Sequence, residues 1–193
     1  MSETLQQLAA EARACRLCAG ELPRGPRPVF QVGRQARVLV AGQAPGARVH
    51  ESGVPFDDAS GERLRHWMGV DRDTFYDPRR VAILPMGFCY PGRGGSGDLP
   101  PLRRCAATWR KRMLAALPGI RLTLVVGRHA MDWHLPGWRG SLADAVRAHD
   151  VHGERMIPLP HPSPRNNPWL AAHPWFEREV VPSVRDRVAS ALR

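Results

Sequence analysis

Short apolar runs alternate along the chain with segments whose apolar residues recur at helical spacing. The runs are rich in Val, Leu and Ile and occupy residues 37–41, 81–85, 122–126 and 156–160, the last being the weakest. Nearly continuous apolar runs of this length are typical of strands that are buried on both faces, as in a parallel sheet. The pattern therefore predicts four parallel strands.

Three segments show the spacing of amphipathic helices. Ser60 is placed to cap the first segment, Pro118 and Gly119 follow the second, and Pro182 is expected to bend the third. Their apolar positions recur every three or four residues: Leu64, Trp67 and Met68; Trp109, Met113 and Leu117; and Phe176, Val180, Val184, Val188 and Leu192. Each stripe of apolar residues would face a core.

The alternation of strands and helices predicts a single α/β domain over residues 1–193. We expect a three-layer α/β/α sandwich with a central four-stranded parallel sheet. Functional sites in such sheets gather where strands end and loops begin. Two unusual segments stand there, GQAPG at residues 42–46 and HPSPRNNPWL at residues 161–170. A further loop at residues 90–101, YPGRGGSGDLPP, is rich in Gly and Pro.

The charge balance favours a polyanionic partner. The chain has 28 basic and 18 acidic residues, and Lys111 is its only lysine, so arginine carries the net charge of +10. Such an excess of positive charge favours binding to nucleic acid, although a compositional bias toward arginine would give the same net charge. The sequence has no apolar stretch of ~18 residues and no signal-peptide core near its start. We therefore expect a cytoplasmic monomer that does not contact membranes.

Four cysteines form a pattern that suggests metal binding. Cys15 and Cys18 form a C-x-x-C motif, and fifteen residues separate Cys89 from Cys105. In a cytosolic protein this motif indicates metal or redox chemistry more often than a disulfide. The spacing alone allows a tetrahedral zinc ion, a four-thiolate iron–sulfur cluster or four unrelated buried thiols.

Three motifs resemble those of the uracil-DNA glycosylase superfamily: GQAPG at 42–46, GVPFDDASGERL at 53–64 and HPSPRNNPW at 161–169. The cysteine pattern is similar to that of the iron–sulfur branch, commonly called family 4. The histidine loop looks closer to the single-strand-selective monofunctional branch. The resemblance implies a monofunctional DNA glycosylase that flips out and excises uracil or another deaminated base during repair of single- or double-stranded DNA. It also implies a 4Fe-4S cluster on Cys15, Cys18, Cys89 and Cys105, with zinc as the alternative.

Base excision needs a donor for the leaving base, a stacking surface, a means of placing water and a wedge in the DNA. His161, held between Pro160 and Pro162, is the expected donor, and Gln43 is expected to place water. The residues expected to contact the base are Gly42, Ala44, Phe56 and Met86. The residues expected to contact DNA are Ser163, Arg165, Asn166 and Asn167, with Trp169 in the same wedge and Arg93 on another loop.

Each of these residues also has an ordinary structural interpretation. His161 would then bond a backbone carbonyl, Phe56 would be a core residue, and Trp169 would cover the core. Two further interpretations concern the whole protein. The chain would be a nucleic-acid-binding protein of the same fold without catalysis, or a small-molecule α/β enzyme with a zinc-stapled terminus.

The sequence departs from the resembled motifs at two points. Gln43 occupies a position where iron–sulfur relatives carry an acid, so Glu51, Asp57 or Asp58 are considered as substitutes. The uracil-reading asparagine expected about four residues before Cys89 is absent, because that stretch reads ILPMGFC. The backbone groups of residues 86–88 are then expected to read the base. This predicts relaxed choice among uracil, hypoxanthine and xanthine.

Overall fold

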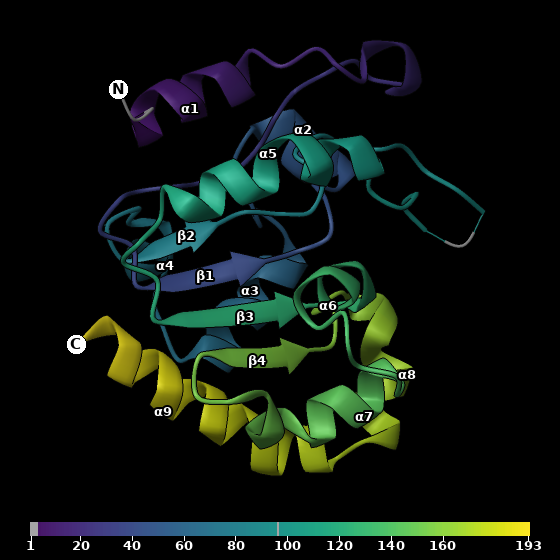
Figure 1. The fold of residues 1–193 in the computed structure, drawn as a ribbon. Coiled ribbons are helices and arrows are strands. Elements are labelled where there is room, and N and C mark those ends of the chain that lie inside the picture. The colour runs from purple at the N-terminus through teal and green to yellow at the C-terminus, as the bar shows by residue number, and fades with distance from the viewer. Residues whose placement is uncertain (1–3, 96) are drawn as a thin grey trace.

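The computed structural model describes residues 4–95 and 97–193, and within them four parallel strands form one sheet (Figure 1). The order across the sheet is β2 (Val81–Ile83), β1 (Val38–Ala41), β3 (Leu122–Val126) and β4 (Met156–Leu159). Val38 pairs with both Val81 and Leu122, which fixes the register of the three strands. The predicted parallel sheet is confirmed. β2 is shorter than expected, because Pro85 has no N–H to continue the ladder.

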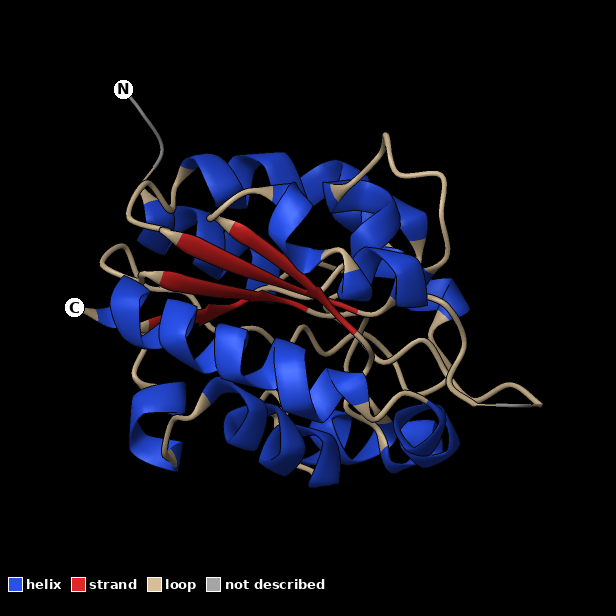
Figure 2. Ribbon diagram, turned by 90° about the horizontal axis from the view of Figure 1, so that it is seen from below, coloured by secondary structure: helices blue, strands red, loops and turns tan. Residues whose placement is uncertain are grey.

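Helices cover both faces of the sheet (Figure 2). The α-helices of the described residues are α1 (Leu5–Arg13), α2 (Ala47–Ser52), α3 (Ala59–Met68), α4 (Arg72–Tyr76), α5 (Arg103–Ala115), α6 (Arg128–His134), α7 (Leu142–Arg147), α8 (Asn167–Ala172) and α9 (Val181–Leu192). Short 3-10 turns are η1 (Ala19–Glu21), η2 (His149–His152) and η3 (Pro164–Asn166), and η4 (Phe176–Val180) is a π-helix. This arrangement confirms the three-layer α/β/α architecture.

Alternate residues of each strand enter different cores, because side chains of a strand point to opposite faces. In β1, Val38 and Val40 join a cluster with α3 and α9, whereas Leu39 joins a cluster with α1 and α5. The apolar stripes predicted from helical spacing supply most of the helical side of these clusters. Trp67 and Phe176, for example, meet edge to face with ring centroids 4.8 Å apart.

Two helix predictions need correction. Asp58, and not Ser60, caps α3: its carboxylate accepts the Gly61 N–H at 2.9 Å, and Ser60 is a buried residue inside the first turn. The last apolar stripe spans two elements, because η4 ends at Val180 and α9 begins at Val181. Pro182 stands in the first turn of α9, directly after the Val181 N–H that bonds the Phe176 carbonyl, and it has no N–H to continue that ladder.

The described helices include none that is long and apolar enough to span a bilayer. The loops that follow β1, β2, β3 and β4 at their carboxyl ends all reach the same edge of the sheet. This parallel topology brings residues 42–46 and 161–166 together, although more than a hundred residues separate them along the chain.

Candidate active site

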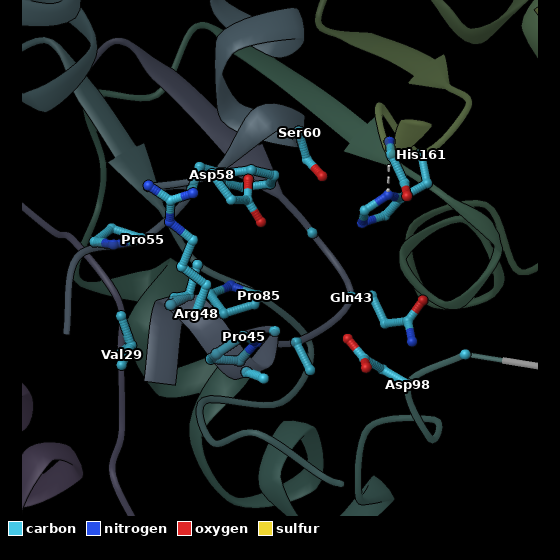
Figure 3. Close-up of a pocket in the computed structure, with 18 of the residues that line it drawn as sticks. Val29, Gln43, Pro45, Arg48, Pro55, Asp58, Ser60, Pro85, Asp98 and His161 are labelled. Atoms are coloured by element: carbon cyan, nitrogen blue, oxygen red, sulfur yellow. Dashed lines mark hydrogen bonds between the residues drawn. The ribbon is translucent and has the colours of Figure 1, made fainter. Parts of the chain in front are cut away.

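A cavity of about 460 Å³ lies beyond the carboxyl ends of β1 and β4 (Figure 3). Its walls come from the loops after β1, β2 and β4, from the start of α3 and from the loop at residues 90–101. The predicted residues that line it are Gly42, Gln43, Ala44, Phe56, Asp58, His161, Ser163, Arg165 and Asn166. The fold thus brings the three resembled motifs to one place.

His161 is held in one orientation by its own loop. The Ser163 N–H donates to Nδ1 of His161 at 3.2 Å, and the Asn166 amide donates to the His161 carbonyl at 2.7 Å. Nδ1 is therefore an acceptor, and a neutral ring carries its proton on Nε2. The ordinary interpretation, a histidine that donates from Nδ1 to a carbonyl, does not apply at this nitrogen.

The surroundings of His161 keep its ring neutral. Burial lowers the pKa of His161 below its usual 6.5, because the imidazolium loses hydration. The carboxylates of Asp58 and Asp98 oppose this effect and raise the pKa. A neutral imidazole that carries its proton on Nε2 still donates a hydrogen bond to a leaving group.

Phe56 is both a wall of the cavity and a neighbour of the core. It has a left-handed backbone with φ of 56°, and its carbonyl accepts the Tyr76 hydroxyl at 3.2 Å. A Cβ on Gly61 would lie 1.8 Å from the Phe56 carbonyl oxygen, and a Cβ on Gly42 would lie 3.3 Å from the ring. Gly61 is therefore required for the position of Phe56, and Gly42 lets the ring approach the turn closely. Phe56 itself holds its left-handed backbone at a cost in strain.

The turn at residues 42–46 is fastened to the segment after β2. The Met86 N–H donates to the Gly42 carbonyl at 2.9 Å, and the Gly87 N–H donates to the Gln43 carbonyl at 2.9 Å. The Phe88 N–H is also engaged, with the Cys105 sulfur at 3.3 Å. The three N–H groups of residues 86–88 therefore already have acceptors within the protein and do not face the base, whereas the expectation that backbone carbonyls of this segment read the base stays a prediction.

Met86 lies in a core cluster with Ala41 and Val125 and is not among the described residues that line the cavity. Ile83 and Pro85 from the same segment do line it. The predicted contact between Met86 and the base has no support in this arrangement. The wall that β2 contributes to the cavity is apolar.

The predicted DNA contacts divide into two groups. Ser163, Arg165 and Asn166 line the cavity, and the Arg165 guanidinium packs over Gly97, where a Cβ would lie 2.5 Å from its Nη1. Asn167 begins α8, and its side chain accepts from Arg63 at 2.8 Å. Trp169 stacks on His173 with centroids 4.2 Å apart and packs against the core. Its side chain therefore covers part of the core, and its expected place in the wedge stays a prediction. Arg93 is exposed on the loop at 90–101.

The carboxylates suggested as substitutes for the acid missing at position 43 lie in different places. Glu51 pairs with Arg24 at 2.6 Å and Asp57 pairs with Arg72 at 3.2 Å, and neither is among the described residues that line the cavity. Asp58 lines the cavity while it caps α3. Asp98, which sequence reasoning missed, lines it as well. Its one sequence signal is that it is the sole acid in the Gly- and Pro-rich loop.

Two arginines, the half-buried Arg63 and the buried Arg110, support the site from behind, and nothing in their sequence surroundings distinguishes them. Arg63 of α3 donates to the carbonyls of Pro162 and Ser163 at 3.3 and 3.2 Å. Arg110 of α5 is 1% exposed and donates to the carbonyls of Leu84 and Pro85 at 2.9 and 3.3 Å. Both side chains hold carbonyls of segments that line the cavity.

The four cysteines line one small pocket on the α1 and α5 side of the molecule. Burial raises the pKa of Cys105 to about 12 and that of Cys89 to about 11. Cys15 and Cys18 are half-buried in the segment between α1 and η1. Within residues 4–95 and 97–193, no group of three or more His, Cys, Asp or Glu side chains has the arrangement of a metal site. The donor set, four thiols around one pocket, nevertheless matches what a four-thiolate metal group needs.

One comparison with known proteins bears on this geometry. The family model described as the uracil DNA glycosylase superfamily matches residues 30–185. The match includes all three motifs around the cavity, together with Cys89 and Cys105, and begins after Cys15 and Cys18. Since it covers most of the 193 residues, the chain belongs to the uracil DNA glycosylase superfamily.

Proposed function

We propose that the protein is a monofunctional DNA glycosylase that removes uracil or another deaminated base from DNA. The observation that carries the proposal is His161, fixed as a neutral Nε2–H donor in a cavity that also contains Phe56 and Gln43. Superfamily membership supports the same class of reaction.

The chemistry follows from what each group can do. Excision breaks the bond between the anomeric carbon of deoxyribose and a ring nitrogen of the base, so the sugar becomes positive and the base negative. The base must first leave the stack, and the ring of Phe56 offers it a new stacking surface. The Nε2–H of His161 then donates to a base oxygen as negative charge develops there. Gln43 can orient the attacking water through its amide but cannot take its proton.

DNA contacts are assigned to the rim of the cavity. Arg165 and Arg48 are exposed cavity residues whose guanidinium groups suit phosphate oxygens. Ser163 and Asn166 are also on the rim, but the Ser163 hydroxyl accepts the Arg165 N–H and the Asn166 amide bonds His161, so both support the loop as well. The net charge of +10 adds a general attraction to the DNA backbone.

The proposed substrate range is broad. The cavity wall from β2 presents Ile83 and Pro85, and the N–H groups of residues 86–88 are engaged elsewhere. A site without a dedicated amide for the base edge discriminates weakly among bases that share an oxo group and a ring N–H. Uracil, hypoxanthine and xanthine all share these groups. Removal is expected to be faster from single strands or mismatches, where extrusion costs less.

For the cofactor we propose a 4Fe-4S cluster on the four cysteines, with zinc as the alternative. The ligands come from the segment between α1 and η1, from the segment after β2 and from the first turn of α5. A bound group of this kind would act as a structural cross-link. It would sit behind the segment at residues 86–88, whose Phe88 N–H already contacts the Cys105 sulfur.

Excision assays test the function directly. Single-turnover reactions would use single-stranded, matched and mismatched oligonucleotides that carry uracil, hypoxanthine or xanthine. We expect release of the free base and an intact abasic strand that breaks only on alkaline treatment. Tight DNA binding without release of any of the three bases would instead establish a catalytically silent DNA-binding protein.

A further inference from the structure

Asp98 occupies an unexpected place in the cavity. It lies on the loop between β2 and α5, yet it shares the cavity with Gln43 and His161, which come from the loops after β1 and β4. Figure 3 shows the side chains of Asp98 and Gln43 pointing toward one another. The opposing effect of Asp98 on the pKa of His161 also indicates that its charge reaches the imidazole.

Backbone contacts from Gly92 and Arg93 hold the segment at Asp98 and Leu99. The backbones of Arg93 and Asp98 form an isolated antiparallel β-bridge, the Leu99 N–H donates to the Gly92 carbonyl at 2.9 Å, and the Gly94 N–H donates to the Gly97 carbonyl at 2.6 Å. The Gln43 amide reaches the Leu99 carbonyl at 3.5 Å. These contacts hold the backbone of Asp98 so that its carboxylate lies toward the turn at residues 42–46.

Gly46 leaves room for this carboxylate. A Cβ at Gly46 would lie 3.5 Å from Oδ2 of Asp98, so the carboxylate rests against the turn itself. Asp58, the other described carboxylate of the cavity, accepts the Gly61 N–H and caps α3. Asp98 has no such capping role, since it stands in a loop and not at a helix start.

A water that attacks the anomeric carbon needs an acceptor for its proton. The amide of Gln43 can hold water but cannot accept a proton at neutral pH, whereas a carboxylate can. A negative charge at the same place also stabilises the positive sugar as the base departs. The cavity therefore needs a carboxylate beside Gln43, and Asp98 stands there.

We propose that Asp98 is the carboxylate of the excision reaction, acting together with the amide of Gln43; this inference rests on the proposed glycosylase function. The bond from the anomeric carbon to the base nitrogen breaks, and the base leaves with the electron pair while His161 Nε2–H bonds its oxygen. The water oxygen forms the new bond to the anomeric carbon. Its proton passes to Asp98 and from there to solvent or to the departed base.

The test compares Asp98→Asn with the wild-type protein and with Asp150→Asn, a control at a side chain that is 80% exposed on η2. Single-turnover excision and DNA affinity are measured on the best substrate found for the wild type. Asp98→Asn should slow excision by about 10- to 100-fold, the lower part of the range for general acid–base groups. Its DNA affinity should stay equal or rise, because a negative charge near phosphates is removed. Asp150→Asn should match the wild type in both.

A second variant separates this role from a structural one. Because the side chains of Gln43 and Asp98 converge, Gln43→Glu in the Asp98→Asn protein returns a carboxylate to the same region, and about tenfold of the lost rate should return. Three outcomes would each overturn the inference. The first is an excision rate of Asp98→Asn within about threefold of the wild-type rate, and the second is an equal loss of DNA affinity and of rate. The third is a double variant that excises no faster than Asp98→Asn. A wild-type protein that excises none of the bases would instead overturn the proposed function, and the role of Asp98 with it.

Discussion

The tautomer of His161 is set by a single backbone hydrogen bond, and this leads to a prediction about its side chain. His161→Ala removes the Nε2–H donor but leaves the loop contact between Asn166 and the carbonyl of residue 161 available. Single-turnover excision should fall by roughly 100- to 1000-fold, the usual scale for loss of one donor to developing negative charge. DNA affinity should change by less than about threefold, because the ring faces the cavity and not the rim. An unchanged rate would refute the donor role.

The protonation state of His161 gives a second test at the same scale. Its pKa is below 6.5, mainly because of burial, so the unfolded chain takes up a proton before the folded chain as pH falls. The contribution of the neutral ring to the free energy of unfolding is therefore fully present above pH 6.5, and it decreases as pH falls below that value. Long-range ¹⁵N–¹H NMR spectra at pH 6.5 should show a neutral ring protonated on Nε2. A protonated ring at pH 7 would contradict this expectation.

At the residue scale, sequence reasoning succeeded where a motif marks a local constraint. His161 and Phe56 each stand in a motif with neighbours that hold them, and both line the cavity. The expected contact between Met86 and the base was not found, because the Met86 side chain packs in a core cluster with Ala41 and Val125. Asp98 was missed because only the folded loop brings it to Gln43. Whether a residue such as Met86 or Asp98 reaches the cavity depends on how segments that are far apart in the chain pack together. A local sequence pattern does not contain this information.

Arg63 connects α3 to the histidine loop, and its removal should loosen that loop without changing the cavity's chemical groups. Its guanidinium donates to the carbonyls of Pro162 and Ser163 and to the side chain of Asn167. Arg63→Met keeps much of the apolar stem and removes these bonds. Excision should fall about tenfold, since misplacement of a donor by a fraction of an ångström is costly.

Hydrogen exchange distinguishes a positioning role for Arg63 from a general loss of stability. Amides of residues 161–167 should exchange faster in Arg63→Met, whereas those of β1 and β3 should not change. Arg79→Met is a matched control, because Arg79 is 75% exposed and pairs only with Asp77 among the described residues. Faster exchange throughout the sheet would show that Arg63 supports the whole fold instead.

At the scale of elements, strands were predicted well because burial on both faces leaves a strong apolar signal. β3 was placed at its observed bounds, and β2 was overextended only past Ile83. The start of α3 was misjudged because Ser60 and Asp58 are both good capping residues, and the choice depends on backbone dihedrals. The π-helix before Pro182 has the same four-residue apolar spacing as an α-helix over one or two turns, so the spacing does not reveal it.

At the scale of the whole molecule, the parallel sheet explains why cysteines and catalytic candidates are neighbours. The segment after β2 carries wall residues of the cavity at Ile83 and Pro85 and then reaches the cysteine pocket at Gly87. A group bound by the cysteines would therefore restrain the same backbone that shapes the cavity. The sequence predicted the four cysteines as a set, but their gathering around one pocket depends on the packing of α1 against α5.

Replacing each cysteine by serine tests whether the four act as one site. If they hold a 4Fe-4S cluster, the wild type should be brown with about four iron and four sulfide per chain. Cys15→Ser, Cys18→Ser, Cys89→Ser and Cys105→Ser should then lose iron, absorbance and soluble yield to a similar degree, because each removes one ligand of a shared group. Zinc without visible absorbance would establish the zinc alternative.

Four unrelated buried thiols would give a different pattern, set by burial alone. Cys105 and Cys89 have the most strongly raised pKa values, to about 12 and about 11, because they are the most deeply buried of the thiols whose pKa shifts. Serine at these two positions would then destabilise the protein, as a buried hydroxyl does without full hydrogen bonding, while Cys18→Ser would resemble the wild type. Melting temperatures of the four variants, measured with metal content, separate a uniform loss from a graded one. A graded loss with no bound metal would overturn the proposed cluster while leaving the excision chemistry at His161 untouched.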